Sequence, residues 1–562
     1  MRLQSVIIPD DGQLPSEMYF KGDTVLSSGK AISFDTFYNC FSYVKYLEYT
    51  MVKSVSFSCK FNGTARVDLC VYDGSEHIIC SGDFTESAEL SAELSDLPDR
   101  GFLYPRLTAL TNLTFISGEY HTDSKPRDIS CCIAICTYKR EKYIAKNTEL
   151  FKKFSFSFIN RVFVIDNGGT LDVDSVSDKT VKVIANKNHG GSGGFTRGLI
   201  EALDGGFSHV VFMDDDIEFH PESLEQMTVF MSLLKDTHIC DWFSAGMIPI
   251  DTPEIQYELG AYWDGRTARV NNNNLDMTDL RNILKNMDKP QINYGGWWTL
   301  CMPLAVVDNG FPYPFFIKFD DIEYGLRRPQ GVEIITVNGI AVRHEAFDKK
   351  TNFTLDYYNL RNQLVVNSLY NRSAREAVRL FMKAVFKQLV LYRYDNIPIV
   401  IRAVKDFLSG VDFFLSTDSE HLNSELIRGV MQMSPLEELS SWNEGLRCDD
   451  HIKDTKITPI MAITGAGHLI PRFALKKGVI AVPLSRASAK DCFRQRAVIQ
   501  YQLGGANGLY TERNFAKFVR YGFKSVGIAL LLLFRYNNAS ADYQQRKSMI
   551  TCREFWNKDL GI

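Results

Sequence analysis

Hydrophobic and polar positions follow three different patterns along the chain. From residue 1 to about 125, segments such as Ser54–Phe61 and Ala65–Gly74 alternate apolar and polar residues, and Gly and Asn turns separate them. A period of two predicts half-buried strands. Several short strands with no helical period predict a β-sandwich or jelly roll over residues 1–125.

The pattern changes after residue 125 to continuous apolar runs that alternate with helical stretches. Continuous apolar runs are typical of strands buried on both faces, and their alternation with helices predicts a parallel, doubly wound α/β sheet over residues 126–370. The expected strands are Cys131–Thr137, Arg161–Gly169, Val181–Asn186 and the run from His209, and the expected helices include Glu141–Lys153 and Gly194–Leu203.

From about Leu355 the chain is mainly amphipathic with a helical period. The segments Leu355–Tyr370 and Ile397–Leu408 are the clearest examples, the second with a proline in its first turn. We therefore expect a helical C-terminal region over residues 371–562. The sequence contains no internal repeat and no low-complexity tract.

Length and composition agree with a globular protein of several domains. The chain has 562 residues, of which 45% are hydrophobic and 23% charged. Its start lacks a long apolar segment, so we expect no signal peptide. The most apolar run, Val526–Phe534, is far shorter than the roughly 20 residues of a spanning helix. Twelve scattered cysteines without metal-ligand spacing predict buried, reduced thiols and a cytoplasmic protein.

The net charge of −4 conceals an asymmetry between the two ends of the chain. Residues 471–562 carry 16 lysines and arginines against 5 aspartates and glutamates, and the remaining residues carry 47 against 62. The basic segment includes the apolar stretch from Phe515 to Arg535. Such a segment is typical of a helix on an anionic membrane surface, and equally of a buried terminal helix with solvated basic flanks.

Three consecutive carboxylates, Asp214, Asp215 and Asp216, follow the apolar run from His209. In an open α/β sheet, ligands bind at the C-terminal ends of the strands. A cluster of like charges is favoured when a cation lies among them, and oxygen ligands suit Mg²⁺ or Mn²⁺, which would hold a diphosphate. The alternative is an acidic turn that caps a helix beginning near Pro221.

Other polar groups occupy neighbouring strand ends. Arg140 follows one predicted strand and Asp166 lies at the end of another, where they would meet a phosphate and a base or ribose, although single residues of this kind are more often caps or turns. The glycine-rich run from Asn188 to Arg197, which includes Gly193, would let the backbone approach a ligand before a helix begins near Gly194. A flexible surface linker is the alternative.

Three later features complete the candidate site. Trp297 and Trp298 follow two glycines and would form a stacking platform for a sugar, or a packed core pair. Asp320 and Asp321 would supply a general base or cap the helix after them. His344 ends an apolar stretch and is a candidate third metal ligand, although a lone histidine is more often structural.

In this order, the motifs resemble the inverting GT-A glycosyltransferases of family 2. The runs Asn188–Arg197, Gly296–Trp298 and Phe316–Arg327 are similar to those of the polymerising galactofuranosyltransferases that build mycobacterial cell-wall galactan. The resemblance is dense from about residue 131 to 370. Outside that range it rests on architecture, because that family also has an N-terminal β-domain and a helical C-terminal region.

The resemblance implies transfer of galactofuranose from UDP-galactofuranose to a hydroxyl of a growing cell-surface glycan. It implies that Asp214, Asp216 and His344 hold Mn²⁺ or Mg²⁺ and that Asp321 is the catalytic base. The donor would be bound by Arg140, Asp166, Asn188, Gly193, Arg197 and Asp215, and the acceptor by Trp297, Trp298 and Asp320.

The partners follow from the same resemblance. We expect a UDP-sugar donor, a glycan acceptor that can be lipid-linked, no nucleic acid, and a homo-oligomer peripheral to the inner face of the cell membrane. Asn359 departs from the family, which has a histidine at this position. Two alternatives stay open: the same chemistry with a rhamnosyl or galactopyranosyl donor, and a non-catalytic glycan-binding scaffold.

Overall fold

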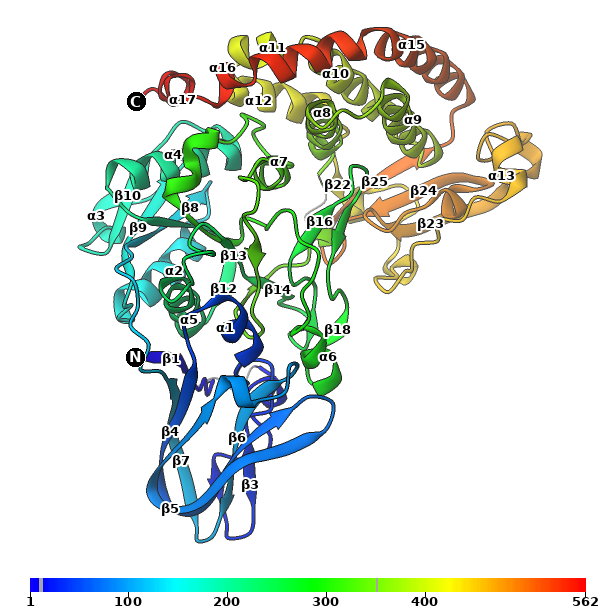
Figure 1. Ribbon diagram of the computed structural model, residues 1–562. Helices are drawn as coiled ribbons and strands as arrows, with labels where there is room; N and C mark the ends of the chain where they lie inside the picture. Colours follow the sequence, from blue (N-terminus) through cyan, green and yellow to red (C-terminus); the bar gives the residue numbers. More distant parts are fainter. Residues whose placement is uncertain (10–13, 350–351) are drawn as a thin grey trace. The chain divides into compact units, whose positions relative to one another are not determined.

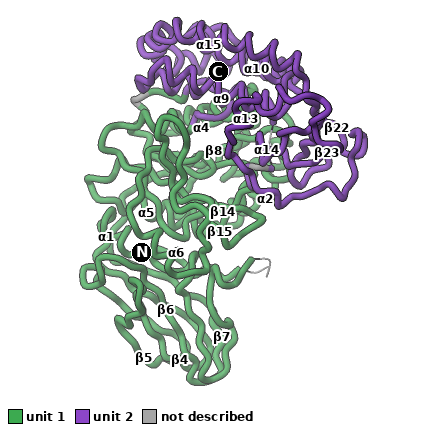
Figure 2. Tube along the Cα trace, turned by 90° about the vertical axis from the view of Figure 1, so that its right-hand side faces the viewer, with its two compact units in different colours: residues 1–312, 321–345, 561 green, residues 313–320, 346–560, 562 purple. Residues whose placement is uncertain are grey.

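The computed structural model describes residues 1–9, 14–349 and 352–562. The chain divides into two compact units, shown in Figure 2. Unit 1 comprises residues 1–312, 321–345 and 561, and unit 2 comprises residues 313–320, 346–560 and 562. The helix at residues 354–369, which lies before the expected boundary at 370, belongs to unit 2.

The N-terminal part of unit 1 is rich in strands, as expected from its alternating pattern (Figure 1). Its seven strands are hydrogen-bonded into one sheet of order β1-β7-β4-β6-β3, with β2 on β7 and β5 on β4. The long strand β4 pairs with β7 along its first half and with β6 along its second half. The bounds are β1 Arg2–Ser5, β2 Val25–Leu26, β3 Ala31–Ser33, β4 Ser54–Tyr72, β5 Glu76–Glu93, β6 Phe102–Ala109 and β7 Leu113–His121.

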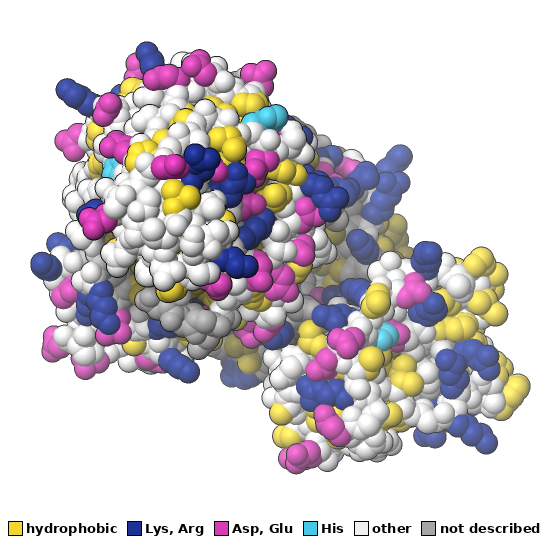
Figure 3. Space-filling model, turned by 90° about the horizontal axis from the view of Figure 1, so that it is seen from below, with side chains coloured by type: hydrophobic (Ala, Val, Ile, Leu, Met, Phe, Trp, Pro, Cys, Tyr) yellow, Lys and Arg dark blue, Asp and Glu magenta, His cyan; other side chains and the backbone are white. Residues whose placement is uncertain are grey.

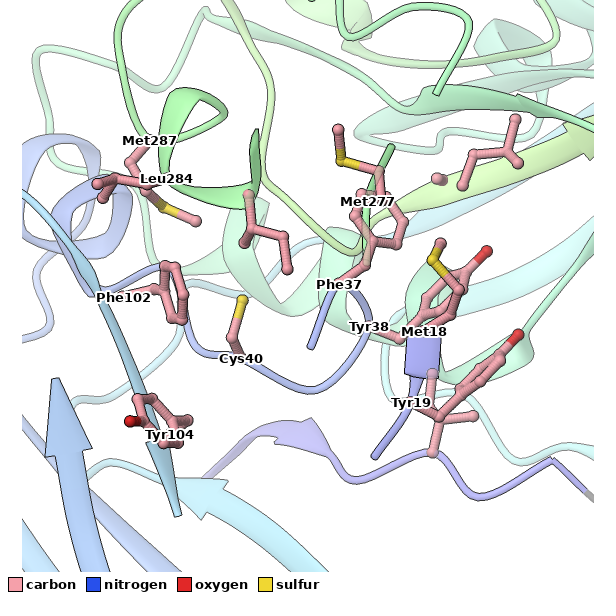
Figure 4. Close-up of a cluster of buried hydrophobic side chains, with 14 of the residues drawn as sticks. Met18, Tyr19, Phe37, Tyr38, Cys40, Phe102, Tyr104, Met277, Leu284 and Met287 are labelled. Atoms are coloured by element: carbon pink, nitrogen blue, oxygen red, sulfur yellow. The ribbon is translucent and has the colours of Figure 1, made fainter. Parts of the chain in front are cut away.

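A shared hydrophobic core joins this sheet to the rest of unit 1. Figure 4 shows side chains from the N-terminal part, such as Tyr19, Phe37 and Phe102, in one cluster with Met277 and Leu284. All five are at most 6% exposed. Because burial of apolar surface stabilises both parts together, the two parts form one compact unit.

The second sheet of unit 1 confirms the expected α/β core. Its order is β10-β9-β8-β11-β19-β13-β20, and the four strands from β10 to β11 are parallel. Strand β19 is antiparallel to both of its neighbours. The bounds are β8 Cys131–Thr137, β9 Ile159–Asp166, β10 Val181–Ala185, β11 His209–Asp214, β13 Trp242–Ser244, β19 Thr299–Pro303 and β20 Ile334–Ile335.

Helix α4 (Gly190–Asp204) begins four residues earlier than the position near Gly194 that the sequence indicated. The helix can begin this early because its glycines let it pack closely on strand β8. A Cβ atom on Gly194 would lie 2.1 Å from the Sγ of Cys136, and one on Gly198 would lie 2.4 Å from the Cβ of Ala134. Close packing between helix and strand therefore explains these two glycines.

Unit 2 contains the expected helices α8 (Thr354–Leu369) and α10 (Ile397–Leu408), together with α9 (Ala374–Val390) and the long α15 (Phe515–Arg546). Helix α15 packs against α8, α9 and α10 (Figure 1). The helical character expected of the C-terminal region is confirmed. The unit also has a four-stranded sheet, which the sequence did not indicate. Its order is β22-β25-β24-β23, with bounds Ser434–Pro435, Asn507–Glu512, Gln495–Tyr501 and Lys476–Pro483.

Two findings on the described residues bear on the expectations from composition. No helix there is both long enough and apolar enough to cross a membrane. All twelve cysteines are free, and seven of them are buried.

Candidate active site

Strand β11 ends at Asp214, so the three acids lie at its C-terminal end. A short strand, β12 (Ile217–Phe219), separates them from helix α5 (Pro221–Ser232), whose N-cap residue is His220. The alternative that the acids cap this helix is therefore excluded. Asp215 and Asp216 are buried and Asp214 is half-buried.

Strand pairing brings His344 to the acids from more than a hundred residues away. Strand β21 (Ala341–His344) is antiparallel to β12, and His344 lies opposite Ile217. The Nε2 atom of His344 is 3.4 Å from an Asp216 oxygen and 4.0 Å from an Asp214 oxygen. Ligand atoms of Asp214, Asp216 and His344 all lie within 4.8 Å of one another, which suits one divalent ion.

The backbone fixes the tautomer of His344 for metal binding. Its Nδ1 is 2.6 Å from the carbonyl oxygen of Glu345. A carbonyl only accepts hydrogen bonds, so Nδ1 carries a proton, and in the neutral imidazole Nε2 then keeps the lone pair that a metal needs. The same bond orients the ring toward the two carboxylates.

The carboxylate of Asp215 is held by two neighbouring side chains. Thr137 Oγ1 donates to it at 2.7 Å, and Arg140 Nη1 lies 3.1 Å from its other oxygen. Burial raises the pKa of Asp215 to about 6, while Arg140 and Thr137 act in the opposite direction. Arg140 also forms an ion pair with Asp216, so one guanidinium bridges two of the three acids.

The turn after β9 is built around Asp166. One carboxylate oxygen of this buried residue accepts hydrogen bonds from the backbone of Gly168 and Gly169, and the other accepts one from Leu171, all at 2.9–3.0 Å. Asn188 has a similar local role, because its Oδ1 accepts from Gly190 N at 3.1 Å. Both residues shape the loops at this end of the sheet.

The two remaining candidate donor residues lie in α4. Gly193 is buried in the first turn of the helix. Arg197 extends along the helix and pairs with Glu201 at 2.9 Å, and its side chain is 15% exposed. The structure thus brings Asp214, Asp216, His344, Asp215 and Arg140 into direct contact, whereas Arg197 pairs with Glu201 of its own helix.

Trp297 and Trp298 are core residues, only 5% and 8% exposed. The Trp297 ring meets Phe212 and Phe195 edge to face at 5.0 and 5.2 Å between centroids. Trp298 lies over Gly296, where a Cβ atom would be 2.3 Å from its ring, and Trp298 Nε1 donates to Ala245 O. The packed-pair alternative therefore describes their contacts better than an open stacking platform.

Helix α7 (Asp320–Leu326) carries the predicted base at its start. Asp320 is buried, and Asp321 is half-buried and accepts a hydrogen bond from Ile322 N at 2.8 Å. On the same helix, Tyr324 meets the Trp297 ring at 6.0 Å. Because Trp297 also contacts Phe212 of β11, aromatic packing links the helix of the base to the strand of the acids.

A strained turn precedes α7. Phe316, Lys318 and Phe319 have φ angles of 72°, 69° and 68°, in the left-handed region that residues other than glycine rarely adopt. Each such residue costs about 1–3 kcal/mol and is kept only where its surroundings fix it. The surroundings here are two side chains of α8.

Arg361 and Asn362 of α8 hold this turn by its carbonyl groups. Arg361 Nη2 donates to Phe315 O at 2.7 Å, and Asn362 Nδ2 donates to Ile317 O and Lys318 O at 2.9 and 2.8 Å. Both side chains are buried. Sequence reasoning assigned neither residue a role, because the contact joins segments more than forty residues apart.

Glu258 was also missed. Its carboxyl group is 2% exposed, and its Oε1 has no hydrogen-bond partner among the described residues. Burial, and next the nearby charge of Asp321, raise the pKa of Glu258 to about 8. The same two causes, in the same order, raise the pKa of the buried Tyr294. No sequence pattern marks either residue, because neither lies at a predicted strand end.

Comparison with known proteins confirms the resemblance. Residues 132–278 match the model of glycosyl transferase family 2, and residues 15–123 match that of the galactofuranosyltransferase 2 N-terminal domain. The chain is 25% identical over 423 residues to the galactofuranosyltransferase GlfT2 of Mycolicibacterium smegmatis, covering 68% of this chain and 65% of that protein.

The corresponding protein of Mycobacterium tuberculosis is 27% identical over 433 residues, covering 68% of this chain and 66% of that protein. The match thus spans just under two thirds of the length of both relatives. Among solved structures, the glucosyl-3-phosphoglycerate synthase of Mycobacterium tuberculosis is 11% identical, with a TM-score of 0.27 over 42% of this chain and 80% of that one. An overlap of this size carries no argument about function.

Proposed function

We propose that this chain, whose residues 132–278 form a glycosyl transferase family 2 domain, is a metal-dependent inverting galactofuranosyltransferase. Its donor would be UDP-galactofuranose and its acceptor a hydroxyl of a growing glycan, which can be lipid-linked. The observation that carries the proposal is the cluster of Asp214, Asp216 and His344 at the C-terminal end of β11. The two similar galactofuranosyltransferases support the choice of sugar.

The donor set fits Mn²⁺ or Mg²⁺, because two carboxylates and one imidazole with a fixed tautomer converge within 4.8 Å. When bound, such an ion neutralises charge that develops on the departing diphosphate. Arg140 is half-exposed beside the acids, and we propose that its guanidinium contacts the same diphosphate. Asp215 would keep Arg140 in place.

Asp321 would remove the proton from the acceptor hydroxyl. An alcohol is a weak nucleophile, and a positioned carboxylate contributes roughly 10²–10⁴ in rate. Attack on the face opposite the leaving group inverts the anomeric centre and needs no covalent intermediate. The acceptor site would be shaped by buried residues that pack under it, namely Asp320, Trp297 and Trp298.

We also propose that the protein works as a homo-oligomer at a membrane surface. Helix α15 leaves large apolar side chains in water on one face, with Phe523 77% and Phe534 78% exposed and Leu530 50% exposed. Spacings of seven and four residues place these three on one helical stripe. Figure 3 views the molecule from the side of the N-terminal strands, where hydrophobic side chains are mixed with both basic and acidic ones.

Release of UDP from a panel of nucleotide-sugars, together with the product mass, tests the proposal. We expect release from UDP-galactofuranose with Mn²⁺ or Mg²⁺, and its loss on chelation. Release only from a rhamnosyl or galactopyranosyl donor would show that the donor carries a different sugar, and the proposed chemistry would stand. Glycan binding without release from any donor would contradict the enzyme and favour a scaffold.

The variant Asp321→Asn tests the base directly. We expect transfer to fall by about 10²–10⁴ while the unfolding temperature is kept. The matched control is Asp236→Asn, because Asp236 has a side chain that is 91% exposed and pairs with Arg127. Near-normal transfer by Asp321→Asn would refute the assignment of the base.

A further inference from the structure

Unit 1 contains a pocket that the proposed reaction does not use. Three segments line it: helix α1 (Tyr43–Tyr49), residues 289–292, and residues 328–336 around strand β20. Its volume is about 230 Å³. Lys45, Lys289 and Arg328 contribute positive charge to its wall, against one carboxylate, Glu333.

Lys45 is the feature that needs an explanation. Its side chain is 2% exposed, and among the described residues its Nζ has one acceptor, the backbone oxygen of Asp288 at 3.0 Å, and no ion pair. A buried ammonium that forms no ion pair is unfavourable, although the carboxylates of Glu48, Asp288 and Glu333 lie within electrostatic range of Lys45. Burial accordingly lowers the pKa of Lys45. An ammonium has three donors, so two remain for a ligand.

Other groups on the wall suit an anion as well. Thr336 is 2% exposed, and its hydroxyl has no hydrogen-bond partner among the residues described. Lys289 lies 5.3 Å from the centre of the Tyr49 ring and pairs with Glu48 at 3.1 Å and with Glu333 at 2.7 Å. The wall therefore offers a buried cation and an unused hydroxyl to one small volume, next to a second lysine that two carboxylates already pair with.

We propose that this pocket binds a phosphate group, either inorganic or carried by a small organic molecule, with Lys45 as its principal contact. Lysine is a common phosphate ligand because its charge is compact and its donors rotate. The volume is below the roughly 300–1,000 Å³ of pockets that hold drug-sized ligands, so a nucleotide-sugar is too large. The apolar residues Ile292, Val332 and Ile335 on the wall leave room for the body of a sugar phosphate.

The pocket adjoins the elements that hold the proposed base. Arg328, two residues beyond the end of α7, donates to Val332 O, Asn293 O and Gly325 O at 2.8–3.0 Å. Asn293 precedes Tyr294, and a Cβ atom on Gly325 would lie 2.5 Å from the Cβ of Tyr294. A ligand in the pocket would therefore stabilise the C-terminal end of α7, which connects phosphate binding to the geometry of the base.

Calorimetric titration of the full chain with inorganic phosphate and with a hexose monophosphate tests the proposal. We expect saturable binding, and at least about tenfold weaker binding by Lys45→Met, the loss expected for one charge-assisted hydrogen bond. The control Lys285→Met removes an exposed lysine of the neighbouring helix and should bind as the parent does. Tighter binding of one probe identifies which source of phosphate the pocket prefers.

Hydrogen exchange of the parent protein provides a second measurement that needs no variant. We expect either probe to slow exchange in peptides that cover residues 286–293 and 328–336. Absence of saturable binding by both probes would overturn the proposal. Equal binding by Lys45→Met and the parent, or protection only around residues 137–140 and 214–216, would also overturn it, because the phosphate would then lie elsewhere.

Discussion

At the scale of single residues, burial decides which carboxyl groups are charged near the candidate site. Asp215 is held between Thr137 and Arg140, yet its pKa is raised to about 6 because it is buried. Glu258 forms no ion pair with a residue that the structure describes, and its pKa is raised to about 8. A protonated Glu258 adds no second negative charge near Asp321, which favours the charged form that the proposed base needs.

Glu258 makes the stability of the protein dependent on pH. Its pKa rises from about 4.5 to about 8 on folding, so between these values the folded state binds more protons than the unfolded state. The stability that this group contributes is therefore fully present below a pH of about 4.5, and it is lost as the pH rises from there through about 8. We expect the unfolding temperature of Glu258→Gln to fall less than that of the parent between pH 6 and 9. Parallel pH profiles would show that Glu258 is charged in the folded protein.

At the scale of elements, packing of α4 on β8 requires glycine. We expect Gly194→Ala to destabilise unit 1 by about 1–3 kcal/mol, because the new methyl group overlaps Cys136. Gly527→Ala is the matched substitution, since Gly527 is exposed within α15 and nothing lies within 4 Å of its Cβ position. It should stabilise α15 by about 0.5–1 kcal/mol. Denaturant unfolding measures both, and an unaffected Gly194→Ala would contradict this packing.

The turn before α7 depends on Asn362 of helix α8. Removing its amide frees two carbonyl groups of a turn that is strained in three residues. We expect Asn362→Ala to lower the transfer rate by a factor of about 10², which is the effect of displacing a reacting group by about 1 Å. We also expect its free energy of unfolding to fall by about 1 kcal/mol. UDP release and thermal unfolding measure the two effects.

The control for this variant is Asn538→Ala, which removes an exposed amide from α15 in the same unit. It should leave both transfer and stability as they are. Full transfer by Asn362→Ala would show that the turn keeps its conformation without the amide, and its role would then be only structural.

At the scale of the whole molecule, we propose that the basic and apolar C-terminal segment brings the protein to a membrane surface. We expect the parent to sediment with vesicles that contain anionic lipid and the double variant Phe523→Ser/Phe534→Ser to stay in solution, because it loses two side chains that are 77% and 78% exposed. Ile78→Ser, at an exposed position of β5, is the control. Equal sedimentation of all three proteins would contradict membrane binding through α15.

Local patterns were sufficient to predict most elements. The runs of apolar residues gave β8 and β11, and the helical period gave α2 (Glu141–Lys153) and α10 at their observed bounds. The sheet of unit 2 was missed because its strands are scattered among helices and loops. The start of α4 was missed because glycine disfavours helix locally, and only packing against Cys136 and Ala134 explains the glycines there.

The sequence by itself determined the chemistry available to this protein. An acidic triplet after an apolar strand, an acid pair before a helix and a histidine after a strand are visible without coordinates, since strand ends are set by local hydrophobic patterns. Only the tertiary structure decided which groups meet. Pairing of β12 with β21 places His344 beside Asp216, and packing brings the buried Glu258 within electrostatic range of Asp321. Contacts of this kind depend on register and packing between distant segments, which no local pattern encodes.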